Sequence, residues 1–205
     1  MISSGWRSDR GSTLPLYIWL TTIILFVSLA FFAFAKAASA RGGAQSAADA
    51  AALAATQEAR DELLLDLEAA IAAGDDNWLD WLDLPAGGLS TDGATAAAAE
   101  LAAQNRSTLQ GDAQLTEVAG DPGFRVVVET NYSVGESVIP GTEALTATAQ
   151  AVAVIQPRCD FDLDADPTKL VTLVCDGEPV DIDPEKFDPD DLPDASVMFS
   201  VRLAE

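Results

Sequence analysis

The chain of 205 residues contains no histidine and two cysteines. Without histidine, neither a Ser-His-Asp nor a Cys-His catalytic arrangement is available, and the common zinc sites are excluded as well. No glycine-rich phosphate-binding loop occurs, and no pair of carboxylates stands out among the 33 acidic residues. We therefore predict that the protein is not an enzyme and that it holds no metal and no cofactor.

Basic residues are scarce, with 11 Lys and Arg against 33 Asp and Glu. Arg7, Asp9 and Arg10 are the charged residues before Lys36, so residues 36–205 carry 9 basic and 32 acidic residues, a formal charge of −23. Such a domain repels nucleic acid and anionic lipid headgroups, and we expect neither as a partner. Its acidity is typical of a domain kept soluble in an extracellular medium.

Charge is also missing from one long stretch near the N-terminus. Residues 11–35 contain no Asp, Glu, Lys or Arg, and residues 14–38 are almost wholly apolar. About 20 such residues in a helix span the hydrocarbon core of a bilayer, which is roughly 30 Å thick. The sequence therefore predicts a single transmembrane helix over residues 14–38, preceded by a cytoplasmic tail over residues 1–13.

The orientation of this anchor is not decided by its flanking charges. Arg7 and Arg10 precede it and Lys36 and Arg41 follow it, so the positive-inside rule gives a tie. The length of the C-terminal portion and its pair of cysteines favour an extracytoplasmic location for that portion.

Outside the cytoplasm, the two cysteines are expected to form one disulfide, Cys159–Cys175. A bridge that closes a loop of this size contributes roughly 3 kcal/mol in the chain-entropy model. Two free buried thiols are the alternative.

The helical pattern continues beyond the anchor. Strong helix formers dominate residues 44–73, so residues 39–73 are expected to extend the helix outside the membrane, with a kink possible at Gly42 and Gly43. Small side chains recur there at helical spacing and form a flat stripe. We predict that this stripe and two polar neighbours form a helix-packing or assembly face: Ala44, Gln45, Ala48, Asp49, Ala52 and Ala55. The alternative is that the stripe packs only on the chain's own β-domain.

Residues 74–205 are predicted to form an acidic α+β domain. A second helix is expected over residues 94–103, and a hairpin over residues 113–132 with its turn at 120–123. Further strands are expected over residues 143–155, 170–175 and 197–203, and an ordered acidic loop over 160–194. The fold class is therefore α+β, with a long N-terminal helix followed by a small extracytoplasmic domain that contains an antiparallel β-sheet.

Four alternate aspartates, at positions 160, 162, 164 and 166, resemble the start of a calcium-binding loop. The sixth position of that loop requires glycine and the twelfth a bidentate glutamate, whereas this chain has Ala165 and Val171. An EF-hand is excluded, and a solvated acidic loop is expected instead; a less regular Ca²⁺ site is the alternative.

Two places in the N-terminal region are candidates for proteolytic processing. An Arg-Gly-Ser run ends at Ser12 and is similar to the cleavage site of type IV prepilins after Gly11, although Leu16 stands where those proteins have Glu. The Ala-Ser-Ala triplet that ends at Ala40 fits the small-x-small rule of signal peptidase. Cleavage there would release a secreted module that begins at Arg41.

A run of small residues begins at Arg41 and reads Arg-Gly-Gly-Ala-Gln-Ser-Ala-Ala-Asp-Ala-Ala-Ala-Leu-Ala-Ala. With the apolar span and the Asp-Arg-Gly-Ser of residues 9–12 before it, it resembles the N-terminal signature of TadE/TadG-related proteins of bacterial tight-adherence (Flp/Tad) pilus systems. The resemblance covers residues 9–60. It implies a single-pass protein of the cell membrane with a cytoplasmic N-terminus, acting as a minor pilin, a pseudopilin or an assembly factor beside other pilus subunits. A surface adhesion or binding module, secreted after cleavage at Ala40, is the alternative.

Overall fold

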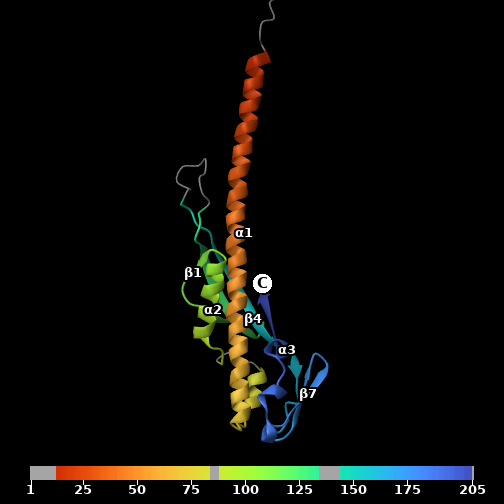
Figure 1. Ribbon diagram of the computed structural model, residues 1–205. Helices are drawn as coiled ribbons and strands as arrows, with labels where there is room; N and C mark the ends of the chain where they lie inside the picture. The colour runs from red at the N-terminus through yellow and green to blue at the C-terminus, as the bar shows by residue number, and fades with distance from the viewer. Residues whose placement is uncertain (1–12, 84–87, 134–143, 205) are drawn as a thin grey trace, which may run out of the picture.

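The computed structural model describes residues 13–83, 88–133 and 144–204. A single long helix forms the axis of the protein, and the other described elements pack around its C-terminal half (Figure 1). The predicted α+β fold, a long N-terminal apolar helix followed by a small domain with an antiparallel sheet, is confirmed.

The long helix, α1, extends over Thr13–Ala72 and contains 60 residues. It continues through Gly42 and Gly43 without interruption, because the alanine and leucine residues on both sides favour helix. Its buried face begins at Ala40 and recurs at helical spacing down to Ile71. The helix is terminated by Gly74, whose left-handed backbone (φ 69°) suits the residue that follows a helix.

The other helical segments are short: η1 (Trp78–Asp83), α2 (Thr91–Gln104), η2 (Pro184–Lys186), η3 (Pro189–Asp191) and α3 (Ala195–Met198). The helix predicted over residues 94–103 lies within α2 and is confirmed. Helix α2 runs antiparallel to α1. Gly93, near its start, lies against Glu58 and Glu62, and Tyr132, which contacts Arg106 just after its end, lies against Gly43.

The main sheet is antiparallel and consists of β1 (Ser107–Leu109), β2 (Gln114–Val118), β3 (Asp121–Thr130), β4 (Thr148–Pro157) and β8 (Phe199–Ala204). The strand order is β1-β3-β4-β8, and β2 also pairs with β3. The predicted hairpin is present, but its turn lies at Ala119 and Gly120 rather than at 120–123. Both residues have positive φ, 57° and 94°, which produces the tight turn that matches strand twist, so Asp121 already pairs with Val118.

A second, smaller sheet contains β5 (Cys159–Asp160), β6 (Val171–Cys175) and β7 (Glu178–Ile182) in that order. The sequence predicted β6 but placed β7 in an acidic loop. Strand β7 forms because Val171 on β6 pairs with Ile182, and both side chains are buried.

The core lies between α1, α2 and one face of the main sheet. Strand β3 contributes alternate residues to it, with Phe124, Val126 and Val128 buried and the residues between them partly exposed. Opposite them, α1 contributes alanines, whose small side chains let the helix lie close to the sheet and to α2. The core therefore occupies the C-terminal half of α1, and its N-terminal half is left uncovered.

Candidate functional site

The uncovered half of α1 exposes large apolar side chains on every side. Trp19, Phe31 and Phe34 are 73%, 76% and 78% exposed, and no residue from Thr13 to Ser39 is buried. Within the described part of the chain, α1 is the one helix long and apolar enough to cross a membrane. Since the apolar window is entirely uncovered, it is not the core helix of the domain below it.

Three hydroxyl side chains in the middle of this stretch hydrogen-bond to their own helix. The hydroxyls of Thr21, Thr22 and Ser28 each donate to the carbonyl oxygen four residues earlier, at 2.8 Å. A hydroxyl in hydrocarbon is costly unless its hydrogen bond is made, and these bonds remove that cost without a second chain. The stretch is therefore compatible with a lipid environment on all of its faces.

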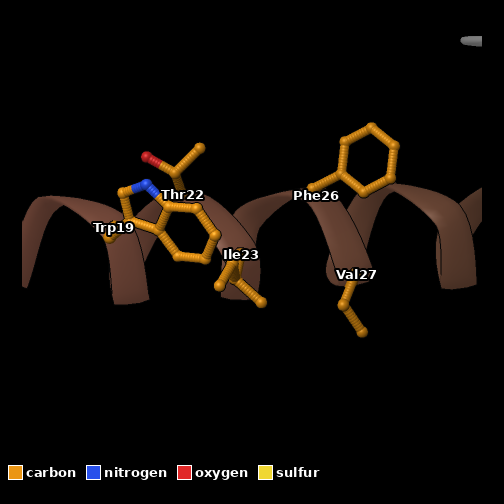
Figure 2. Close-up of a pocket in the computed structure, with 5 residues that line it drawn as sticks. All are labelled: Trp19, Thr22, Ile23, Phe26 and Val27. Atoms are coloured by element: carbon orange, nitrogen blue, oxygen red, sulfur yellow. The ribbon is translucent and has the colours of Figure 1, made fainter.

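A hollow of about 530 Å³ lies along this stretch, between Trp19, Thr22, Ile23, Phe26 and Val27. Figure 2 shows that all five side chains project from consecutive turns of the same helix. Because the hollow has no wall from a second element, it has the form of a furrow between side chains, suited to lipid chains or an adjacent helix.

The stripe that the sequence predicted as a packing or assembly face lies in an intramolecular interface. Ala44, Ala48, Ala52 and Ala55 have no exposed surface and belong to the hydrophobic core or its upper end. The sequence left open the alternative that the stripe packs on the chain's own domain, and this placement corresponds to that alternative. A neighbouring molecule does not reach these four methyl groups while the domain is folded.

Gln45 and Asp49 lie at the edge of this interface. The Gln45 side-chain amide donates to Asp49 Oδ1 at 2.8 Å and to the backbone oxygen of Gln150, on β4, at 3.4 Å. Gln45 is exposed and Asp49 is half-buried, so this pair is the accessible part of the predicted face.

Of the four residues at the candidate processing sites, Gly11 and Ser12 lie outside the described residues. Ala40 and Arg41 lie inside α1, about halfway along it. Ala40 is 5% exposed and begins the buried face, whereas Arg41 points to solvent. The bond between them is therefore part of a continuous helix.

The predicted disulfide is confirmed: Cys159 and Cys175 are bonded and face each other across β5 and β6. The bridge closes a loop with a sequence separation of 16. A second tie holds the same loop, since the Trp78 indole N–H donates to the carbonyl oxygen of Pro167 at 2.9 Å. The disulfide thus closes the acidic segment on itself, and Trp78 ties that segment to η1, just after the end of α1.

Reduction of this disulfide is expected to lower the free energy of unfolding by about 3 kcal/mol, because the open loop gains conformational freedom in the unfolded chain. Urea denaturation with and without a thiol reductant measures the difference. The Cys159→Ser/Cys175→Ser variant is the control, since its stability should not respond to reductant. Equal stability of the oxidised and reduced wild-type protein would contradict the prediction.

The acidic loop uses its carboxylates to build turns. Asp162 accepts a hydrogen bond from the backbone N–H of Asp164, and Asp166 accepts from Thr168 and from the Lys169 ammonium. The hydrogen bond from Lys169, followed by those from Thr168, lowers the pKa of Asp166 to about 2. The stabilisation that ionised Asp166 contributes is therefore fully present above its unfolded pKa of about 4 and is lost as the pH falls toward 2.

Among the described residues, no group of three or more Cys, Asp or Glu side chains is placed to hold a metal ion.

One contact at the upper end of the domain was not predicted. The guanidinium of Arg106 lies 4.9 Å from the centre of the Tyr132 ring, and the Tyr132 hydroxyl lies against Gly43 of α1. A side chain at position 43 would collide with that hydroxyl, so glycine serves close packing here rather than a kink. The three residues are far apart in sequence, and no local pattern indicates that they meet.

Comparison with known proteins gives one family. Residues 11–61 match the family described as Putative Flp pilus-assembly TadE/G-like. The matched segment covers the uncovered half of α1 and most of the alanine stripe, and it agrees with the resemblance found in the sequence. No match was found among curated proteins or among solved structures.

Proposed function

We propose, from the match of residues 11–61 to the TadE/G-like family, that this chain is a membrane-anchored structural component of a bacterial Tad-type pilus assembly system. The observation that carries the proposal is that the matched segment consists of two parts with different environments. Its first part is an apolar helix with no buried residue, and its second part is the helix face that the domain covers. A protein built this way holds a folded domain at a membrane surface, which is a structural rather than an enzymatic task.

The organisation we propose has a cytoplasmic tail over residues 1–13, a membrane span over 14–38, a helical continuation over 39–73 and an extracytoplasmic domain over 74–205. The change from exposed to buried side chains at Ala40 supports the boundary between the second and third parts. The disulfide supports the orientation, because disulfides form and persist outside the cytoplasm.

Within such a system, a minor pilin or pseudopilin is the specific role we propose, with other pilin or assembly subunits as partners and no nucleic acid. Two accessible regions support contacts with such subunits: the furrowed apolar half of α1, and the surface pair Gln45 and Asp49. Close contact between spans needs no enclosed pocket, since neighbouring membrane helices associate by side-chain packing.

Deletion of the gene in the native bacterium is expected to abolish pili, and the full chain is expected to restore them. A variant with Ile24→Lys and Leu25→Lys should fail to restore them and should leave the membrane fraction, because each lysine at the centre of a span costs about 2.5–3.5 kcal/mol. The matched control is Leu65→Lys with Ala72→Lys, at exposed positions on the same helix beyond the span. Normal pili in the deletion strain would contradict the proposal.

The intact mass of the protein from native cells separates this role from its alternative. A chain that begins at Met1 or Ile2 indicates a permanent anchor, and a chain that begins at Ser12 indicates a processed pseudopilin. A chain that begins at Arg41 would instead support a secreted adhesion or binding module, cut within what is here a continuous helix.

A further inference from the structure

The positive charges of the domain fall into two groups. Nine lysines and arginines lie in the described residues, and five of them form ion pairs with a carboxylate: Arg60, Arg158, Lys169, Lys186 and Arg202. The other four have no carboxylate partner in the described part of the chain: Lys36, Arg41, Arg106 and Arg125. Because the chain has 33 acidic residues, a cation without a carboxylate partner is unexpected.

Three of these four cations lie at the same end of the domain, next to the proposed membrane span. Lys36 lies in the last turn of the span and Arg41 just beyond it on α1, and the Lys36 ammonium lies 5.2 Å from the centre of the Phe32 ring. Arg106 reaches this end through the fold, because it ends the antiparallel α2 and stacks on Tyr132, which lies against Gly43. In Figure 1, β1, which begins directly after Arg106, lies at the end of the domain nearest the uncovered half of α1.

The depth of this end matches the headgroup layer of a bilayer. Gly43 is seven residues beyond Lys36, which corresponds to about 10 Å along the helix axis. The polar layer on each side of a bilayer is roughly 5–8 Å thick, and an arginine side chain adds several ångströms of reach. The three cations therefore lie at, or just outside, the level of lipid phosphates.

The acidic charge of the domain does not cancel this arrangement. No Asp or Glu occurs on α1 before Asp49, and Asp49 accepts its hydrogen bond from Gln45. On the sheet, Glu129 pairs with Thr108, two residues after Arg106, and its carboxylate accepts a hydrogen bond from Thr146. The acidic loop and the small sheet lie at the opposite end of the domain (Figure 1). Exposed charges separated by more than the Debye length, about 8 Å at physiological ionic strength, are largely screened from one another.

We propose that Lys36, Arg41 and Arg106 bind the headgroups of anionic phospholipids and so hold the upper end of the domain against the membrane. Tyr132 orients Arg106 for this contact, since a stacked guanidinium has fewer positions to lose on binding. The inference rests on the membrane anchor proposed above. The net negative charge of the domain predicts repulsion of anionic lipid headgroups, and at this end of the domain the three cations replace that repulsion with attraction. Each cation near an anionic surface is expected to raise affinity about five-fold.

The test uses the full chain in vesicles of equal parts phosphatidylglycerol and phosphatidylcholine. After gentle extraction, mass spectrometry of the intact complexes gives the ratio of the two lipids that remain bound. The wild-type protein is expected to retain phosphatidylglycerol in excess, and Arg106→Gln is expected to reduce that excess about five-fold. Lys186→Gln is the matched control, because Lys186 is an exposed cation of η2 in the acidic segment at the opposite end of the domain, and its loss changes the net charge by the same amount.

Three outcomes would overturn the inference. Equal retention of both lipids by the wild-type protein would do so. Equal losses in the Arg106 and Lys186 variants would also do so, because they would indicate a general effect of net charge. Failure of the wild-type protein to float with vesicles of phosphatidylcholine alone would remove the membrane anchor itself, and this inference with it. Retention by Arg106→Lys close to that of wild type would support it.

Discussion

Replacement of Ala48 and Ala52 together by leucine is expected to remove much of the stability of the domain. Both alanines have no exposed surface and belong to the hydrophobic core. Extra methylene groups in a packed interface cost about 1–3 kcal/mol per site, whereas the whole free energy of unfolding of a domain is about 5–15 kcal/mol. Thermal unfolding of the full chain in detergent micelles, followed by circular dichroism, measures the loss.

The matched control places leucine at Ala69 and Ala72, which are exposed on the same helix. Since both side chains are exposed, the melting temperature of the Ala69→Leu/Ala72→Leu variant should stay close to that of the wild type. The experiment also separates the two roles of the alanine stripe. An unchanged melting temperature in Ala48→Leu/Ala52→Leu, combined with defective pili, would assign the stripe to contacts between subunits and would contradict the packing described here.

The second large effect is expected at Trp78. Its side chain is 1% exposed, and its indole N–H donates to Pro167 in the loop closed by the disulfide. Trp78→Ala should lower the free energy of unfolding by about 3–5 kcal/mol, because a large buried side chain leaves a cavity and the Pro167 carbonyl loses its donor. Urea denaturation measures the change.

Two variants give this prediction its controls. Trp78→Phe keeps an aromatic ring but not the donor, so most of the loss should be recovered. Trp81→Ala removes the neighbouring tryptophan, which is half-buried, and should cost less. If Trp78→Ala and Trp81→Ala were equally destabilising, Trp78 would not be the residue that ties the acidic segment to η1, beside the end of α1.

The helices could be predicted because their signals are local. The run without charge from residue 11 to 35 and the alanine-rich residues after it specify α1, and small helix formers specify α2. Strand β7 could not be predicted in the same way. Its five residues include Pro179 and two acids, and it becomes a strand only because β6 pairs with it and Ile182 reaches the core.

The candidate site, like the fold, could be predicted only where its signal is local in the sequence. Periodicity identified the alanine stripe, but helical spacing is the same whether a face packs on its own domain or on another chain. The stacked pair Arg106 and Tyr132 depends on α2 and β3 ending at the same level, which is a property of the assembled domain. Local sequence therefore gives the faces of the elements, and the tertiary fold determines what each face meets.

The unbroken course of α1 has a mechanical consequence. No flexible hinge separates the proposed span from the domain, because the same helix continues from Thr13 to Ala72 and the core is built on its last half. The part of α1 beyond Ser39 is about 50 Å long, and membrane helices tilt by about 20° on average, so a tilt of this size carries the far tip of the domain sideways by about 17 Å. A change in bilayer thickness, or the docking of a neighbouring span, is therefore transmitted to the acidic tip as displacement.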